Sequence, residues 1–242
     1  MKISVIICCY NGVEYVEDSL ESVFNQTLDK IHYDVIFIND GSEDGTNLIA
    51  NKYLSYNNFF YYENPNNLGL SASCNRGLEI AKSTHIIRLD ADDYLDESAL
   101  EEFWSTMQKE NVDLIISDRF EINSITQKSK RISLKKLDLF CFISCGVMMK
   151  RNILDKIGGY RDFLHEEYDL YLRYLEYTQK RPYYIEKCLY YYLRHPKSMT
   201  HEKGWMQNAW TELIQEWGIE NLNQYGVIPK EYAIKNHDTK RT

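Results

Sequence analysis

Apolar runs and amphipathic segments alternate along the first 95 residues, and this alternation limits the fold more than any other feature. Four apolar runs have the length of strands, and the first looks buried on both faces: 3–9, Tyr33–Ile38, Phe59–Glu63 and His85–Leu89. Between them lie three segments with helical spacing of apolar residues: Val13–Asn25, Thr46–Tyr56 and Ser71–Ala81. The repeated order of strand and helix implies right-handed crossovers. We therefore predict an α/β fold with a mostly parallel central sheet flanked by helices.

Polar side chains follow three of these strands at the point where each strand ends. The three segments are Cys8-Cys9-Tyr10-Asn11, Asn39-Asp40-Gly41-Ser42 and Asp90-Ala91-Asp92-Asp93. In an open parallel sheet, ligands bind at the carboxyl ends of the strands, so these segments indicate a binding site. The sequence contains neither G-x-G-x-x-G nor G-x-x-x-x-G-K-[ST], so it supports neither a dinucleotide fold nor a P-loop.

The third segment carries three carboxylates within four residues, Asp90, Asp92 and Asp93. Such charges repel one another unless a cation or hydrogen-bond donors compensate them. Hard divalent ions such as Mg²⁺ or Mn²⁺ prefer carboxylate oxygens and often share them with a substrate phosphate. The alternative is structural, because Asp92 or Asp93 could cap a helix over Glu97–Gln108. The cluster alone leaves both interpretations open.

The second half of the chain has a less regular pattern. It predicts helices and strands together with a polar, basic loop at Asn123–Lys136. The predicted helices are Ser98–Glu110, Arg151–Ile157, Glu166–Tyr177 and Trp205–Trp217, and the predicted strands are Asp113–Ile116, Phe142–Met149 and Cys188–Leu193. No internal repeat or linker separates two domains.

Bulk properties exclude several classes of protein. A net charge of −8 argues against a general nucleic-acid binder, so no nucleic-acid partner is expected. No apolar run approaches the roughly 18–20 residues that cross a bilayer. The apolar start of the chain ends at Tyr10-Asn11-Gly12 without a cleavage site, which favours a strand over a signal peptide. We therefore expect a cytoplasmic protein with reduced cysteines.

The ordered motifs resemble those of glycosyltransferase family 2. The resemblance runs from residue 3 to about residue 200. It rests on the following motifs: Ser4-Val5-Ile6-Ile7-Cys8-Cys9-Tyr10-Asn11, Ile38-Asn39-Asp40-Gly41-Ser42, Asn67-Leu68-Gly69 with Asn75-Arg76-Gly77, Leu89-Asp90-Ala91-Asp92-Asp93, and Glu166-Glu167-Tyr168-Asp169-Leu170. It implies the GT-A fold and transfer of a sugar from a nucleotide-diphosphate donor, with inversion at the anomeric carbon.

The resemblance also implies residue roles. The nucleotide sugar would be held by Cys8, Tyr10, Asn11, Asp40, Asn67, Asp90 and Ala91. Among these, Asp40 matches the acid that hydrogen-bonds a pyrimidine ring, usually uracil, which favours a UDP-sugar. The metal, Mn²⁺ or Mg²⁺, would be held by Asp90, Asp92 and His195, with Asp93 as an additional carboxylate. Without the resemblance, Tyr10 could equally be a core aromatic and Asp40 a turn residue. A lone histidine before a proline, such as His195, is more often structural.

The general base is where the sequence departs from the family pattern. The usual Glu-Asp pair is Glu166-Glu167 here, so Glu167 occupies the position of the catalytic aspartate. A base must reach the acceptor hydroxyl and take its proton. Acidic residues are also common at a helix N-terminus, which predicts Glu166, Glu167 and Asp169 equally well. We take Glu167 as the base, with Glu166 and Asp169 as alternatives.

The expected partners are a nucleotide-diphospho-sugar donor and a saccharide or lipid-linked glycan acceptor, in bacterial surface polysaccharide or glycoconjugate synthesis. A homodimer and a peripheral membrane contact through Lys128–Lys136 and the Trp205–Trp217 helix are further hypotheses. The expected domain is 1–200, with a nucleotide-binding part to about residue 95 and an acceptor-binding part from about 96, followed by a helical extension at 201–242. The competing functions are a metal-dependent phosphohydrolase with Asp90 as nucleophile and a non-catalytic nucleotide-sugar-binding protein.

Overall fold

The computed structural model describes residues 2–136, 138, 146–201 and 203–233. Its strands are β1 (Ile3–Cys9), β2 (Tyr33–Asn39), β3 (Phe59–Glu63), β4 (His85–Asp90), β5 (Tyr94–Leu95), β6 (Leu114–Asn123), β7 (Ser129–Ile132), β8 (Val147–Lys150) and β9 (Tyr183–Arg194). Its α-helices are α1 (Val16–Phe24), α2 (Thr46–Asn51), α3 (Leu70–Ile80), α4 (Ala99–Glu110), α5 (Arg151–Ile157), α6 (Glu166–Thr178), α7 (Trp205–Trp217), α8 (Ile219–Leu222) and α9 (Lys230–Ala233). Two short 3-10 helices are η1 (Lys30–His32) and η3 (Met199–His201).

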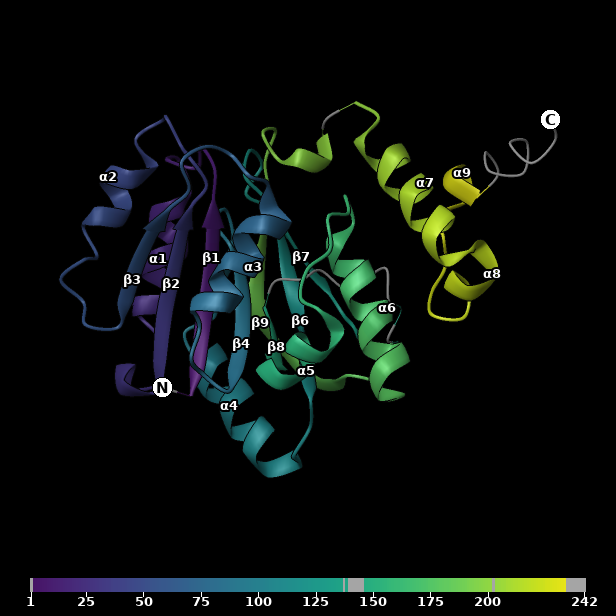
Figure 1. The fold of residues 1–242 in the computed structure, drawn as a ribbon, viewed down its shortest axis with the longest axis horizontal. Coiled ribbons are helices and arrows are strands. Elements are labelled where there is room, and N and C mark those ends of the chain that lie inside the picture. The colour runs from purple at the N-terminus through teal and green to yellow at the C-terminus, as the bar shows by residue number, and fades with distance from the viewer. Residues whose placement is uncertain (1, 137, 139–145, 202, 234–242) are drawn as a thin grey trace.

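One mixed sheet runs through the described part of the chain in the order β3-β2-β1-β4-β8-β6-β9-β5, and β7 pairs with β6 (Figure 1). The β3-β2-β1-β4 half is parallel throughout, as the alternating pattern predicts. β8 is antiparallel to both β4 and β6, while β6 and β9 are parallel. The predicted mostly parallel α/β sheet is therefore confirmed, with antiparallel pairs in its second half.

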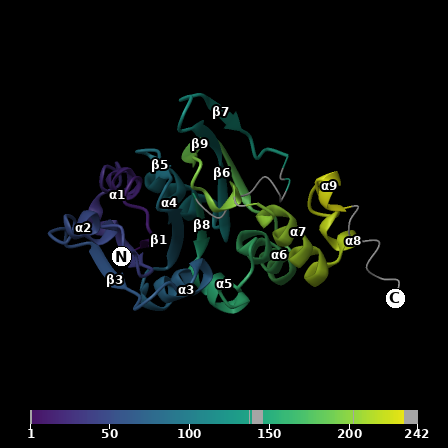
Figure 2. The ribbon, with the colours of Figure 1, turned by 90° about the horizontal axis from the view of Figure 1, so that it is seen from above.

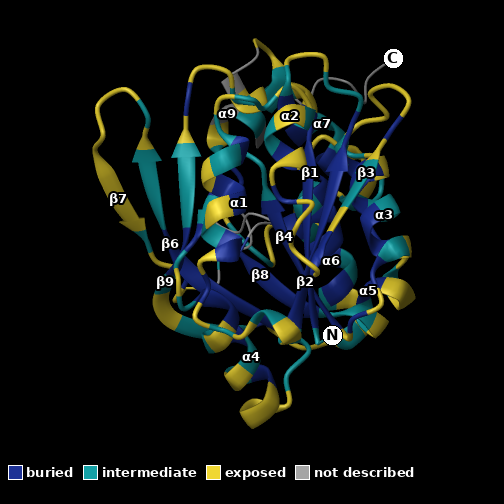
Figure 3. Cartoon of the chain, turned by 90° about the vertical axis from the view of Figure 1, so that its left-hand side faces the viewer, coloured by how far each residue is buried: buried dark blue, intermediate teal, exposed yellow. Residues whose placement is uncertain are grey.

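Helices cover both faces of the sheet (Figure 2). One apolar cluster joins the sheet to α1, α2 and α4, and the other joins it to α3, α5, α6 and α7. Along β1, Ile6 and Cys8 belong to the second cluster, whereas Ile7 and Cys9 belong to the first. Because successive side chains of a strand point to opposite faces, this continuous apolar run fills both layers. The buried strands are dark blue in Figure 3.

The sequence prediction is wrong about the length of the strands beyond β4. The predicted strand Asp113–Ile116 continues to Asn123 as β6, and the predicted strand at Cys188 begins at Tyr183 as β9. The predicted basic loop contains β7, an exposed edge strand that pairs with β6 (Figure 3). Charged side chains are typical of solvated loops, but they also occur on edge strands, where they prevent pairing with another chain. The composition of this segment therefore did not distinguish a loop from an edge strand.

Polar residues inside β6 explain why its length was missed. Asp118 is fully buried, yet it accepts hydrogen bonds from Arg131, from the backbone N–H of Leu134 and from the hydroxyl of Tyr184. The strand thus continues through a satisfied polar network and not through a continuous apolar run. The first half of the predicted strand Phe142–Met149 lies outside the described residues, and its end forms part of β8.

The C-terminal helices pack on the same core as α6. Trp210 of α7 lies 5.8 Å from the ring of Tyr168 of α6, and Leu213 and Leu222 belong to the same apolar cluster. The division at residues 95 and 200 stays a prediction. Within the described residues, every helix is too short or too polar to qualify as a membrane span.

Candidate active site

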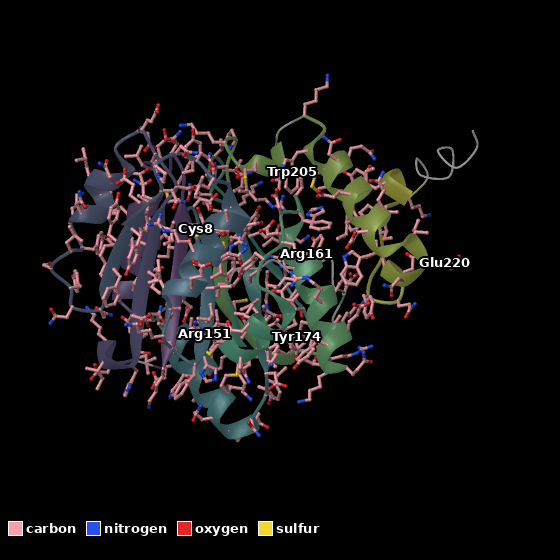
Figure 4. All side chains as sticks on the ribbon, viewed as in Figure 1. Cys8, Arg151, Arg161, Tyr174, Trp205 and Glu220 are labelled. Atoms are coloured by element: carbon pink, nitrogen blue, oxygen red, sulfur yellow. The ribbon has the colours of Figure 1, made fainter. Side chains whose placement is uncertain are left out.

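A cavity of about 950 Å³ opens at the carboxyl ends of β1, β2 and β4. This volume falls at the upper end of the range of ligand pockets, roughly 300–1,000 Å³. Its opposite wall comes from the start of α6, the segment after β9 and the start of α7. Cys8 and Trp205, both labelled in Figure 4, mark the contributions of the sheet and of α7. The cavity therefore joins segments that lie far apart in the sequence.

All residues predicted to hold the nucleotide sugar line this cavity: Cys8, Tyr10, Asn11, Asp40, Asn67, Asp90 and Ala91. The ring of Tyr10 is half exposed, which makes it available to stack on a planar ligand and contradicts the alternative of a core aromatic. Asn11 adopts a left-handed backbone conformation, with φ of 51°, and its side chain accepts a hydrogen bond from the N–H of Glu43.

Asp40 is buried and organises the loop that follows β3. Its carboxylate accepts hydrogen bonds from the backbone N–H groups of Leu68 and Gly69 and from the side chain of Asn64, at 2.9, 3.0 and 2.6 Å. The neighbouring Gly41 has φ of +75°, and a β-carbon there would lie 2.6 Å from the backbone carbon of Asn66. A tight turn and a carboxylate therefore hold this loop against the cavity.

The acidic cluster divides into two partly buried carboxylates and one fully buried carboxylate. Asp90 and Asp92 line the cavity, whereas Asp93 accepts hydrogen bonds from the hydroxyl of Tyr190 and the N–H of Leu193 on β9. Burial and the two neighbouring carboxylates raise the pKa of Asp93 well above its ordinary value. Asp93 thus ties β9 to the cluster.

The capping alternative for the cluster is wrong. Helix α4 begins at Ala99, not Glu97, and Ser98 precedes it as the N-cap residue. The carboxylate of Asp96 accepts hydrogen bonds from both the N–H and the hydroxyl of Ser98. Asp92 and Asp93 instead belong to the turn before β5.

His195 lies against the cluster, although 103 residues separate it from Asp92 along the chain. Its Nε2 is 2.9 Å from a carboxylate oxygen of Asp92, and its ring stacks on Tyr15 at 4.2 Å between centroids. Lys197, two residues further on, pairs with Glu14. The segment after β9 is thereby fastened over the carboxyl end of β1.

The site also contains an arginine that the sequence analysis missed. Arg88, only 4% exposed, lies two residues before Asp90 on β4 and pairs with Asp90 at 2.8 Å and with Glu166 at 2.6 Å. An arginine inside an otherwise apolar strand is rarely buried without a carboxylate partner. That pattern, Ile86-Ile87-Arg88-Leu89, was the available signal.

The three candidate bases occupy different surroundings. Glu166 and Glu167 line the cavity, and Asp169 is fully buried away from it. Asp169 accepts from Arg161, Arg173 and the indole of Trp217. Because its oxygens bind three donors in the protein core, Asp169 has a structural role, which argues against it as the base.

Charge separates the two glutamates. Burial and the Glu167 carboxylate raise the pKa of Glu166 well above its ordinary value, and Arg88 offsets only part of that rise. Burial also acts to raise the pKa of Glu167, but His165, the backbone N–H of Glu167 itself and Arg88 outweigh it and lower the pKa below the ordinary value. Glu167 is therefore the glutamate that is ionised at neutral pH and able to accept a proton.

The donor set of Asp90 and Asp92 suits a hard divalent cation. The nearest ligand atoms of Asp90, Asp92 and Asp93 lie within 4.8 Å of one another, and all are carboxylate oxygens. Two of the three carboxylates line the cavity, so an ion there would also reach a bound diphosphate. The residues present fit Mg²⁺ or Mn²⁺.

The fold is that of the GT-A glycosyltransferases. The structure superposes on S. aureus TarS in complex with UDP-GlcNAc with a TM-score of 0.72 and 19% sequence identity, covering 88% of this chain and 67% of that one. It also superposes on the mannosyltransferase PcManGT from Pyrobaculum calidifontis, in complex with GDP-Man and Mn²⁺. That match has a TM-score of 0.66 and 14% identity, and it covers 94% of this chain and 66% of the other.

The sequence defines the family. The model of Glycosyl transferase family 2 matches residues 4–166, and the chain belongs to this family. A cholesterol galactosyltransferase of Borreliella burgdorferi is 37% identical over 134 residues, which are 55% of this chain and 36% of that protein. The chain thus spans about a third of the length of this relative.

Proposed function

We propose that this protein is an inverting, metal-dependent glycosyltransferase that uses a UDP-sugar. The observation that supports the proposal is the meeting of Asp92, Asp40 and Glu167 in one cavity large enough for a nucleotide sugar. A UDP donor is further supported by the likeness to TarS, which was solved with UDP-GlcNAc. The proposed acceptor is a saccharide or lipid-linked glycan of a bacterial surface polymer or glycoconjugate.

In this proposal, Glu167 takes the proton of the acceptor hydroxyl. The acceptor oxygen forms a bond to the anomeric carbon from one face, and the bond to the diphosphate breaks on the other, which inverts the configuration. The electron pair of that bond leaves with UDP. Tyr10 stacks on the base, and Asp40 either contacts it or positions the loop of Asn67 that does.

Asp90, Asp92 and His195 are the proposed holders of Mn²⁺ or Mg²⁺. When bound, such an ion supplies Lewis-acid stabilisation of the negative charge on the leaving diphosphate. Arg88 is proposed to hold the carboxylate of Asp90 in place from behind, because it donates from the buried side of the strand. This role explains why the Arg88 guanidinium is buried beside the carboxylates of the site.

The two competing functions receive less support. A phosphohydrolase would use Asp90 as its nucleophile, and the Arg88 cation that pairs with Oδ1 of Asp90 makes that carboxylate a weaker nucleophile. A non-catalytic sugar-nucleotide binder would be favoured if Glu167 lay far from the donor site. Glu167 instead lines the same cavity as the residues proposed to hold the donor. Neither alternative needs Glu167, whose lowered pKa keeps it ionised in the cavity lining.

Release of UDP from a panel of UDP-sugars in the presence of Mn²⁺ tests the proposal. We expect Asp92→Ala to abolish release and Asp155→Ala, at an exposed carboxylate on α5, to leave it unchanged. Unchanged release in Asp92→Ala, or phosphate release from simple phosphate esters, would refute the transferase. A thermal-shift screen of the same sugars identifies the donor, because a bound ligand stabilises the folded state.

Membrane contact is a separate proposal. The exposed side chains of Lys128, just before β7, and of Lys130 and Arg131, within β7, offer a basic surface to anionic lipid. The apolar face of α7, including Trp210 and Leu213, packs in the core and is unavailable. Flotation with phosphatidylserine vesicles should recover the protein, and its failure to float would remove this proposal. A homodimer stays a prediction.

A further inference from the structure

His165 is a buried titratable side chain in the described part of the chain, at the start of α6. It immediately precedes α6 and is 3% exposed. Neither Nδ1 nor Nε2 has a hydrogen-bond partner among the described residues. A buried polar group without a partner costs free energy, so its presence at a candidate active site calls for an explanation.

Aromatic rings fix the orientation of the imidazole. Tyr168 lies 4.6 Å from it between ring centroids, and Trp205 and Trp210 of α7 meet it edge to face at 5.2 and 5.3 Å. The preceding residue is held as well, because the N–H of Leu164 donates to Glu212 of α7. Among the described residues, aromatic rings thus enclose the imidazole on several sides, and an acidic neighbour lies beside it.

That neighbour is Glu167. The Nδ1 atom of His165 lies 3.7 Å from Oε1 of Glu167, which is longer than a hydrogen bond but close enough for strong attraction. A small rotation of the glutamate side chain would bring the two atoms to hydrogen-bonding distance. His165 itself does not line the cavity, whereas Glu167 and Trp205 do. The imidazole therefore lies behind the glutamate.

We propose that His165 is a positioning residue for Glu167: its Nδ1–H donates to one carboxylate oxygen and leaves the other oxygen to take the acceptor proton. This inference rests on the proposed function, in which Glu167 is the base. His165 keeps its proton throughout, so Glu167 remains the group that takes the proton of the acceptor hydroxyl. The contact explains why a polar ring is kept among tryptophans.

The other charged groups around Glu167 act from different sides. Arg88 acts from β4, and Glu166 is the neighbour of Glu167 on α6. Helix α7 presents the uncharged rings of Trp205 and Trp210 to His165. Of these groups, His165 makes the largest contribution that lowers the pKa of Glu167. Its removal should therefore make the base harder to ionise.

Two substitutions separate positioning from packing. His165→Phe keeps an aromatic ring without a donor, and His165→Asn restores an N–H donor near the position of Nδ1. With the UDP-sugar that gives the fastest UDP release, we expect His165→Phe to lower kcat roughly 10- to 100-fold with an unchanged KM for the donor. His165→Asn should recover most of that loss. The matched control is His85→Phe, at a buried histidine at the other end of β4, which should leave kcat unchanged.

A second measurement is independent of turnover. The ¹³C titration of the Glu167 carboxyl, assigned with Glu167→Gln, should move to higher pH in His165→Phe and stay in place in His85→Phe. An unmoved titration together with an unchanged kcat in His165→Phe would overturn the inference. If Glu167→Gln retains full UDP release, or if no UDP-sugar is cleaved, the proposed function fails instead, and the titration still decides the His165 contact.

Discussion

Removing the buried cation of the site offers the sharpest test of how its charges are balanced. Arg88 lies between Asp90 and Glu166, with N–O distances of 2.8 and 2.6 Å, and is 4% exposed. Arg88→Met keeps most of the aliphatic length and removes the charge, so two carboxylates are left without their partner. Breaking a buried pair in this way costs about 3–5 kcal/mol. At about 2–4 °C per kcal/mol for a chain of this size, Tm should fall by roughly 6–20 °C.

The loss should also depend on pH. Without Arg88, the pKa of the buried Glu166 carboxyl rises further, whereas in the unfolded chain it keeps its ordinary value. A carboxyl whose pKa is raised in the folded state lowers the free energy of unfolding most at pH values above that pKa. Once the carboxyl is protonated, it lowers the free energy of unfolding only a little. The destabilisation of Arg88→Met relative to the parent protein should therefore be larger at pH 8 than at pH 5.5.

Urea unfolding followed by tryptophan fluorescence measures both effects. Lys52→Met is the control, because Lys52 and its partner Glu17 are both exposed. Such a surface pair contributes roughly 0–1 kcal/mol. A loss in Arg88→Met no larger than that of Lys52→Met, or one that does not change between the two pH values, would refute the idea that Arg88 balances the buried acids.

Three further predictions address the loop, the base and the metal. Gly41→Ala should destabilise the protein by about 1–3 kcal/mol, because the new β-carbon meets Asn66 at a positive φ; an unchanged Tm contradicts this. The rate of UDP release should fall only below the ordinary pKa of a glutamate, since the lowered pKa of Glu167 keeps the base ionised above it; an acid limb near neutrality counts against Glu167. Treatment with EDTA should abolish release and added Mn²⁺ should restore it, whereas full activity after chelation would exclude a metal at Asp92.

Several parts of the fold could be predicted because they depend on local pattern. The strands β1 to β4 are apolar runs ended by polar residues, and β1, β2 and β4 fill the two faces of a parallel sheet. The same logic placed Asp40 and Asp90 at one edge of the sheet, and both line the cavity. The pattern failed at β6, where the buried Asp118 and its partners replace apolar side chains.

The division of labour among the acids could not be predicted. Asp92 faces the cavity whereas Asp93, its neighbour, bonds to β9, and Glu167 faces the cavity whereas Asp169 binds two arginines in the core. Adjacent carboxylates have the same intrinsic chemistry. Their roles differ because of the donors that packing brings to them.

The sequence by itself determined the alternation of β1 to β4 with α1 to α3, the edge of the sheet at which the cavity opens, and the family. Only the tertiary structure brought His195 to Asp92, Arg88 to Glu166 and the ring of His165 behind Glu167. The physical reason is that local periodicity encodes which side of an element is buried. Electrostatic interactions depend on distances between residues remote in the chain, and only packing fixes those distances.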